Sequence, residues 1–200
     1  MAQRKKRRAE VKRKTKETKI SAELDLDGTG KVKAKTPYGF MDHMITALSK
    51  HALFDLTITA TGDVEVDAHH TVEDLGLVLG EALLTALGDK KGIARFGSAR
   101  VPMDESLASA VVDISGRPCL VYDVNIPKRR QWEFDCNLLK EFFQALASTA
   151  RITLHLKLDY GDNYHHACEA VFKAAGRALC QACAPDPRVK GVPSSKGTLK

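Results

Sequence analysis

The sequence predicts an α+β fold built from two similar halves, each with the element order β-β-α-β-α. Two observations indicate this. Apolar residues with strand-like alternation and with helical spacing follow one another in the same order twice. A His-His-x-x-Glu signature also occurs twice, as His69-His70-x-x-Glu73 and His165-His166-x-x-Glu169, with the copies 96 residues apart. A duplication explains both repeats at once, and we place its boundary near residues 92–100.

The elements of the first half follow from local patterns. Alternation predicts a strand over 18–27, and the Asp-Gly-Thr-Gly cluster at 27–30 predicts a hairpin turn into a return strand at 32–34. Apolar spacing predicts a helix over 42–53 and a longer helix over 71–87 that ends at Gly88. Between these helices, strands are expected at 54–60 and 64–66, around a Thr-Gly-Asp turn.

The second half follows the same plan. Strands at 107–114 and 119–124 flank a Ser-Gly-Arg-Pro turn, and a helix over 137–148, a strand over 152–158 and a helix over 165–183 follow. We therefore divide the chain into a basic N-terminal tail (1–14), two repeat halves (15–95 and 96–184) and a C-terminal tail (185–200), which together form one compact domain.

Composition excludes several classes of protein. A hydrophobic content of 44% is typical of a globular chain, and no apolar run approaches the roughly 18 residues of a membrane span. The N-terminus lacks the apolar stretch of a secretory signal, and no CxxC pair is duplicated among five cysteines. We therefore expect a cytoplasmic protein with reduced thiols and no membrane partner.

The positive charge is concentrated at the N-terminus. Residues 1–19 hold ten Lys/Arg and two Glu, whereas the other 181 residues have a net charge of −2. A basic tail can bind nucleic acid, but this one has no interleaved aromatic residues. A solvated tail, or one that docks on a neighbouring subunit, is therefore the favoured interpretation.

The repeated signature has the geometry of a metal site. On a helix, the first histidine of each copy shares a face with the glutamate four residues later, and the second histidine points about 100° away. Counting back a similar distance from each copy reaches His43 and Glu141, each near the start of the preceding helix. Pairing the His/Glu clamp of one copy with the single histidine of the other predicts two sites: His43, His70, His165 and Glu169, and His69, Glu73, Glu141 and His166. Nitrogen and oxygen ligands without thiolate suit Mn²⁺, Fe²⁺ or Zn²⁺, and the carboxylates favour Mn²⁺.

Other polar residues have less specific patterns. His51 can reach the metal site from the helix of His43, or it can be a buried, hydrogen-bonded histidine. His155, which faces away from its leucine neighbours in a strand, is either a partner of a metal ligand or a structural residue. A set of basic and hydroxyl side chains suits a phosphate group: Arg95, Arg117, Lys173, Ser194, Ser195 and Lys196.

Six segments together resemble one known family: 39–44 (GFMDHM), 67–74 (DAHHTVED), 102–105 (PMDE), 113–118 (DISGRP), 165–174 (HHACEAVFKA) and 193–197 (PSSKG). They are similar to imidazoleglycerol-phosphate dehydratase, an enzyme of histidine biosynthesis, from about residue 8 to the C-terminus. The resemblance implies a duplicated fold like the second domain of ribosomal protein S5. It also implies two Mn²⁺ ions per active site, and a cage of 24 subunits with the active sites between them.

The resemblance also implies residue roles. The catalytic candidates are Glu17, His51, Glu73 and Glu169, with Glu17 as an acid/base candidate. The implied substrate-binding set is Glu17, His43, His51, His69, His70, Glu73, Arg95, Arg117, His165, Glu169, Lys173, Ser194, Ser195 and Lys196. Some relatives carry His in place of Glu141, which puts the geometry and metal preference of the second site in question. Two other functions remain open: a dinuclear metal-dependent phosphoesterase, and a nucleic-acid binder that uses the basic tail.

Overall fold

The computed structural model describes residues 6–126 and 134–199, and the elements below are those of this part of the chain. The first half contains β1 (Arg8–Lys14), β2 (Thr18–Asp25), β3 (Val32–Lys35), α1 (Gly39–Ala52), β4 (Asp55–Gly62) and α2 (His69–Leu87). The second half contains β5 (Phe96–Met103), β6 (Ser106–Asp113), β7 (Cys119–Asp123), α3 (Leu138–Ala150), β8 (Thr153–Tyr160) and α4 (Tyr164–Cys183). The predicted duplicated α+β fold is confirmed, and each half has one further strand at its start.

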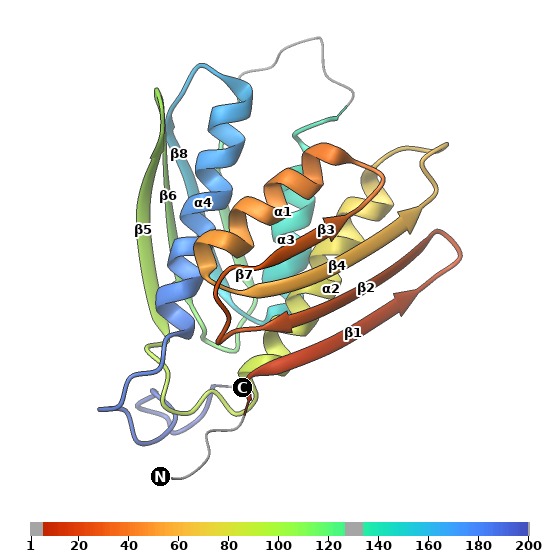
Figure 1. Cartoon of the computed structure of the whole chain (residues 1–200). Coiled ribbons are helices and arrows are strands. Elements are labelled where there is room, and N and C mark those ends of the chain that lie inside the picture. The colour runs from red at the N-terminus through yellow and green to blue at the C-terminus, as the bar shows by residue number, and fades with distance from the viewer. Residues whose placement is uncertain (1–5, 127–133, 200) are drawn as a thin grey trace.

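Each half forms its own four-stranded sheet, with the orders β1-β2-β4-β3 and β5-β6-β8-β7. The first two pairs of each sheet are antiparallel, whereas β3 pairs with β4, and β7 with β8, in parallel. A parallel pair needs a long crossover connection, which α1 and α3 provide. The four helices lie between the two sheets, and both described chain ends lie at the same end of the molecule (Figure 1).

Two strand predictions of the first half are wrong. Residues 27–30 do not close a hairpin between neighbouring strands, because β4 lies between β2 and β3. The crossover through α1 sets this order, and the spacing of turn residues does not reveal it. Residues 64–66 are not a strand, and the side chains of Val64 and Val66 are exposed beyond the end of β4.

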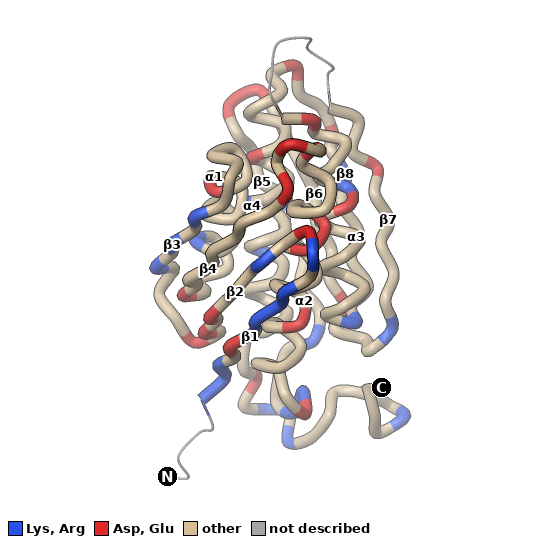
Figure 2. Tube along the Cα trace, turned by 90° about the vertical axis from the view of Figure 1, so that its right-hand side faces the viewer, with Lys and Arg blue, Asp and Glu red and all other residues tan. Residues whose placement is uncertain are grey.

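The predicted N-terminal tail is also wrong over residues 8–14, which form the edge strand β1; residues 1–5 lie outside the described part. Carboxylates outside β1 neutralise both of its arginines. Arg8 contacts Asp25 at 2.6 Å, and Arg13 Nε donates to Asp74 at 2.8 Å. Figure 2 shows the Lys and Arg positions of β1 close to acidic positions. These paired cations make a flexible nucleic-acid-binding arm an unsuitable description of residues 8–14.

The core lies on the helix-facing side of both sheets. Alternate residues of the central strands β2, β4, β6 and β8 are buried under the helices, and the residues between them are half-buried or exposed. His155 belongs to the exposed set, opposite Val111 and Val121 on the outer face of the second sheet. This position leaves His155 away from the helices that carry the predicted ligands. Within the described residues, no helix has the length and apolarity that crossing a membrane requires.

Matching glycines let the helices pair closely. A β-carbon on Gly176 of α4 would lie 2.2 Å from the Leu48 carbonyl oxygen of α1, and one on Gly80 of α2 would lie 2.7 Å from the Leu146 carbonyl oxygen of α3. Gly80 and Gly176 are separated by 96 residues, the same offset as the two signatures. The duplication therefore extends to the close contacts α1–α4 and α2–α3, which place the candidate ligands.

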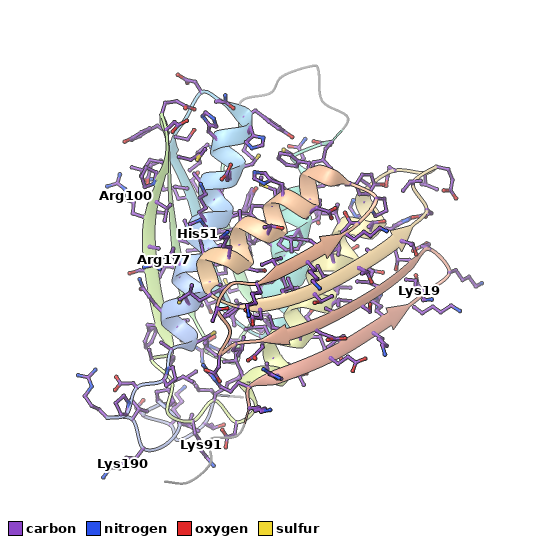
Figure 3. All side chains as sticks on the ribbon, in the orientation of Figure 1. Lys19, His51, Lys91, Arg100, Arg177 and Lys190 are labelled. Atoms are coloured by element: carbon purple, nitrogen blue, oxygen red, sulfur yellow. The ribbon has the colours of Figure 1, made fainter. Side chains whose placement is uncertain are left out.

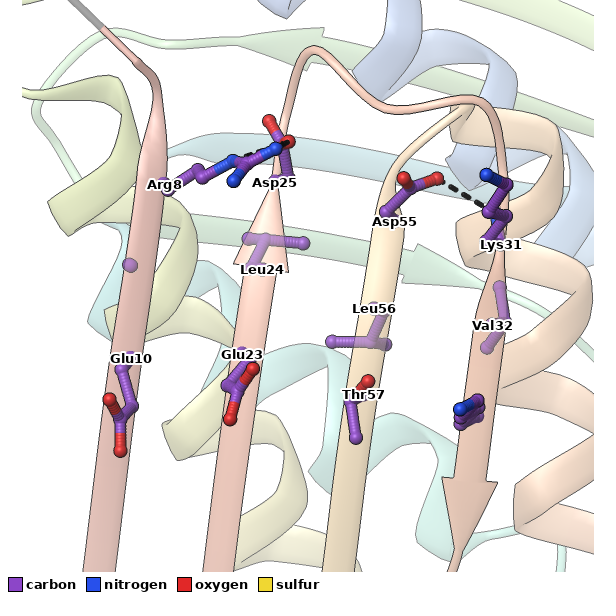
Figure 4. A pocket seen from close by; sticks show the side chains of 12 residues that line it. Arg8, Glu10, Glu23, Leu24, Asp25, Lys31, Val32, Asp55, Leu56 and Thr57 are labelled. Atoms are coloured by element: carbon purple, nitrogen blue, oxygen red, sulfur yellow. Dashed lines mark hydrogen bonds and ion pairs between the residues drawn. The ribbon is translucent and has the colours of Figure 1, made fainter.

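One end of the first sheet is fixed by Asp55. Its Oδ1 accepts the backbone N–H groups of Thr29 at 2.7 Å and Lys31 at 2.9 Å. These hydrogen bonds lower the pKa of Asp55 from its ordinary value. Figure 4 shows this contact and the Arg8–Asp25 pair at the rim of a hollow of about 770 Å³ on the outer face of the sheet, which is not where the repeated histidines lie.

We expect Asp55 to make stability depend on pH. Because its pKa is lower in the folded than in the unfolded chain, its contribution is present above the unfolded value near 3.8 and is lost as the pH falls through the folded value. Urea unfolding should therefore show Asp55→Asn to be less stable than the wild type at about pH 7, with the difference narrowing below about pH 4. Equal stability at both pH values would contradict this role.

Candidate metal centre and active site

Asn163 sets the start of α4 and with it the second signature. Its side chain accepts the backbone N–H groups of His165 at 2.9 Å and His166 at 3.3 Å, as an N-cap does. The helix then places His165 and Glu169 on one face, with Nε2 and Oε2 3.3 Å apart. The sequence prediction that these two residues form a clamp agrees with this geometry.

α1 adds a third ligand candidate. His43 Nε2 lies 3.1 Å from His165 Nε2 and 3.2 Å from Glu169 Oε2, and the two imidazole rings stack. The candidate ligand atoms of these three residues all lie within 4.8 Å of one another. The structure thus brings together, within one chain, three of the four residues of the first predicted site. The fourth, His70, is not part of this cluster.

The electrostatics of the cluster favour an ionised carboxylate. Glu169 is 8% exposed, and this burial works against its charge. Hydrogen bonds from Lys173, whose Nζ is 2.7 Å from Glu169 Oε1, and from His43 outweigh burial and lower the pKa of Glu169. A negative oxygen beside two imidazole nitrogens is a donor set that fits a divalent transition-metal cation.

The second predicted site is only partly assembled. His69 Nε2 and Glu73 Oε2 lie 3.8 Å apart on α2, and α2 packs against α3, which carries half-buried Glu141 near its start. Glu141 of α3 corresponds by helix order to His43 of α1, but His69, Glu73 and Glu141 do not converge as His43, His165 and Glu169 do in the described part of the chain. The fourth residue, His166, is on α4 and contacts Glu105 instead of these three residues.

The second histidine of each signature, His70 or His166, contacts a carboxylate that was not among the predicted site residues. Asp63 Oδ2 is 2.9 Å from His70 Nδ1, and Glu105 Oε2 is 2.7 Å from His166 Nδ1. These hydrogen bonds raise the pKa of both histidines and lower that of Glu105 to about 2. Asp63 and Glu105 lie in turns, where acidic residues are common, so residue type did not distinguish them from solvated charges. Glu105 does belong to the 102–105 segment of the family resemblance, which was the one sequence signal that could have pointed to it.

Glu17 lies in the turn between β1 and β2. Thr15 Oγ1 accepts the backbone N–H groups of Glu17 at 3.1 Å and Thr18 at 2.9 Å, which fixes the turn. The Thr18 hydroxyl donates to the buried carboxylate of Asp74, next to Glu73 on α2. Glu17 Oε2 consequently lies 3.9 Å from His70 Nδ1. The acid/base candidate is therefore beside the first signature and outside any basic tail.

His51 lies on α1 toward its C-terminal end and faces α4. Figure 3 shows it next to Arg177, where the two helices cross. Burial, followed by the nearby cations Lys173 and Arg177, lowers the pKa of His51, while Glu169 opposes the shift. His51 is half-buried and favours the neutral imidazole. The two alternatives were a histidine that reaches the metal site and a buried structural histidine. The position of His51 near Glu169 and Lys173 agrees with the first.

The anion-binding candidates other than Lys173 lie at the opposite end of α4. Arg95 N–H donates to the Ala182 carbonyl at 2.9 Å, and the Arg95 guanidinium contacts Asp113 at 2.7 Å and the Pro193 carbonyl at 2.8 Å. Arg117 is exposed in the turn after β6, the strand that ends at Asp113. The C-terminal segment is folded back here, where the Ser194 hydroxyl accepts the Lys196 N–H at 3.2 Å.

The distance between the two groups follows from helix geometry. Glu169 and Ala182 are thirteen residues apart on one helix, which corresponds to about 20 Å at 1.5 Å per residue. A small substrate cannot span the His43 cluster and the Arg95 end of the same chain. The two groups can therefore serve one site only if different subunits supply them.

Comparisons with known proteins agree with this set of residues. The family model for imidazoleglycerol-phosphate dehydratase matches residues 36–179. The chain belongs to the imidazoleglycerol-phosphate dehydratase family. The dehydratase of Trichlorobacter lovleyi is 55% identical over 194 residues, covering 97% of this chain and all of the relative. That of Geobacter sulfurreducens is 54% identical over 193 residues, covering 96% and 99%.

Solved structures of the dehydratase family share the fold. The enzyme of Pyrococcus furiosus, in complex with (S)-C348, superposes with a TM-score of 0.82 at 42% identity, over 94% of this chain and all of that one. The enzyme of Staphylococcus aureus gives 0.79 at 39% identity, over 88% and 98%. The predicted class of enzyme, a hydro-lyase of histidine biosynthesis, is therefore confirmed.

Proposed function

We propose that this dehydratase converts D-erythro-imidazole-glycerol phosphate into imidazole-acetol phosphate and water, with two Mn²⁺ ions in each active site. The observation that carries the proposal is the convergence of His43, His165 and Glu169 from two helices in a chain of the dehydratase family. The duplicated helix pair α2–α3 supplies His69, Glu73 and Glu141 for the second ion. The oxygen-rich second set, with Glu141 in place of an imidazole, favours Mn²⁺.

The reaction requires catalysis because the C–H group next to a neutral imidazole ring is only weakly acidic. Bound divalent cations would supply Lewis-acid stabilisation of the charge that develops on the imidazole ring and hold the substrate hydroxyls. Glu17 is placed to move a proton, since its carboxylate lies beside His70 and its position is fixed by the Thr15 turn. Neutral His51, next to Lys173, is a second candidate for proton transfer.

The active site is proposed to lie between subunits. In one chain the Arg95 end of α4 is about 20 Å from Glu169, and His70 is outside the His43 cluster. A neighbouring copy can bring its His70 to His43, His165 and Glu169, and its His69, Glu73 and Glu141 to His166. A further copy can add the phosphate-binding groups. A closed assembly such as the 24-subunit cage would satisfy these contacts for every chain, in the cytoplasm where histidine biosynthesis occurs.

Product analysis tests the reaction. We expect Mn²⁺-loaded protein to form an acetol phosphate without releasing inorganic phosphate, and a chelator to stop turnover. Release of inorganic phosphate would favour a dinuclear phosphoesterase, which would use the same cations to activate water. Turnover that a chelator leaves unchanged would contradict the metal-dependent proposal.

The role of the C-terminal segment gives a separate prediction. Lys196 is exposed next to Ser194, and we expect it to bind the substrate phosphate. Lys196→Ala should raise KM by about tenfold or more, because a charge-assisted hydrogen bond is lost, while Mn²⁺ content stays unchanged. Lys190→Ala removes another exposed lysine near this end (Figure 3) and should leave KM unaltered. Loss of metal in Lys196→Ala would refute the phosphate role.

A further inference from the structure

His70 and His166, which point away from the His69–Glu73 and His165–Glu169 pairs, share one feature. In both, the ring nitrogen Nδ1 faces a carboxylate: His70 faces Asp63 Oδ2 at 2.9 Å and His166 faces Glu105 Oε2 at 2.7 Å. An ionised carboxylate only accepts hydrogen bonds, so the proton must lie on Nδ1. A neutral imidazole in this tautomer has its lone pair on Nε2. In contrast, His43 and His165 approach each other through Nε2.

The two carboxylates come from different positions of the repeat. Asp63 directly follows β4, whereas Glu105 is in the turn between β5 and β6. The counterpart of that turn in the first half, between β1 and β2, carries Glu17, whose carboxylate stays 3.9 Å from His70. The halves therefore build the same hydrogen bond with different residues. Glu105 therefore forms the hydrogen bond with its histidine, whereas Glu17, the residue at the equivalent turn, does not.

The surroundings restrict the two carboxylates in different ways: burial encloses Asp63, and hydrogen bonds hold Glu105. Asp63 is the more enclosed, with a side chain 15% exposed, and its Oδ1 is buried without a hydrogen-bond partner in the described part of the chain. Glu105 is more exposed, but its Oε1 accepts the Ser106 hydroxyl at 2.9 Å and the Asn163 N–H at 3.0 Å. Asn163 also caps α4, so Glu105 and His166 are fixed to the same helix end.

The geometry points to Asp63 and Glu105 as positioning residues that orient His70 and His166 and leave the lone pair on Nε2 of each for a divalent cation. Asp104 Oδ2 lies 3.7 Å from Nε2 of His166, which is beyond hydrogen-bonding distance. This inference rests on the dimetal centre of the proposed function. Carboxylates in this position fix the tautomer and the ring direction of a ligating histidine and increase its basicity. It follows that Asp63 takes over the orienting task in the first half and leaves the Glu17 carboxylate available for proton transfer.

Mn²⁺ titration of the full-length protein tests the inference. We expect Asp63→Ala and Glu105→Ala each to weaken Mn²⁺ binding by about 10- to 100-fold, measured from the free Mn²⁺ signal in electron paramagnetic resonance. Asp63→Asn and Glu105→Gln should lose less, because an amide oxygen still accepts the Nδ1 proton but lacks the charge. Circular dichroism and thermal melting would confirm that the variants are folded.

Matched controls remove one carboxylate from the loop of Asp63 and one from the loop of Asn163, which contacts Glu105, and they leave every histidine in place. Glu65→Gln lies two residues after Asp63, and Asp162→Asn directly precedes the α4 cap; both side chains are exposed. Both should bind Mn²⁺ like the wild type. Folded Asp63→Ala and Glu105→Ala with wild-type affinity would overturn the inference, as would amide variants that lose as much affinity as the alanine variants.

A second measurement does not depend on the variants. Anomalous scattering from Mn²⁺-loaded crystals of the wild type should place the cations next to Nε2 of His70 and His166. Nδ1 of each histidine should remain hydrogen-bonded to Asp63 or Glu105, respectively. Cations bound through Nδ1 would overturn the inference and leave the dimetal centre intact. A wild-type protein that binds no Mn²⁺ would instead refute the proposed function itself.

Discussion

Replacing Glu169 with glutamine should lower kcat/KM by about 10³-fold or more and remove about half of the bound Mn²⁺, because Glu169 belongs to one of the two proposed metal sites. Glu169 supplies the only carboxylate of the His43–His165–Glu169 cluster found in the described residues, and it is also the ion-pair partner of Lys173. The amide of glutamine has nearly the same shape, so the core is kept while the negative charge is lost. Metal analysis and steady-state kinetics on the same preparation would measure both effects.

The control for Glu169→Gln is the same substitution at Glu81, an exposed residue of α2 away from the signatures. Glu81→Gln should keep wild-type turnover and metal content. The predicted role of Glu169 would be refuted by a folded Glu169→Gln variant that retains both Mn²⁺ and activity. A variant that retains Mn²⁺ but loses turnover would limit Glu169 to a role in the chemical step.

Mixing two inactive variants should restore activity if the site lies between subunits. His165→Ala damages the face formed by α1 and α4, and His70→Ala damages the face formed by α2 and α3. Each is expected to be inactive alone. When equal amounts are assembled together, random pairing leaves both faces intact in about one quarter of the sites, so about one quarter of wild-type activity should return.

The geometry provides a strict control for this experiment. His165→Ala mixed with Glu169→Ala damages the same face in every chain, so no pairing creates an intact site and no activity should return. Size-exclusion chromatography of the mixtures, with one variant tagged, would verify that both chains enter the same assembly. Mixed assemblies of His165→Ala and His70→Ala that stay inactive would contradict a site shared between subunits.

The strands show where local pattern was sufficient and where it was not. The period-two pattern of β2, with Ile20, Ala22 and Leu24 buried, was visible in the sequence because burial on one sheet face needs alternation. The order of strands was not, since β3 pairs with β4 through a crossover helix whose path depends on the packing of α1. β1 was hidden because the exposed face of an edge strand is rich in charge, as a solvated tail is.

The candidate site divides in a similar way. Helix periodicity by itself predicted the pairs His69–Glu73 and His165–Glu169, because residues four apart on a helix share a face. The contact of His43 with the second pair depends on how α1 crosses α4 at Gly176, which no local pattern encodes. Asp63 and Glu105 were missed for the same reason, since their partners are imidazoles brought close only by the fold.

The sequence by itself determined the duplication, the type of most elements, the family and the residues that can bind a metal. These properties depend on neighbours along the chain and on residue identity. Only the tertiary structure decided which of those residues meet. Packing of α4 on α1 assembles one cluster at one end of α4, while the fold places Arg95 and the C-terminal segment at the other, because a rigid helix of about 30 Å keeps its two ends apart.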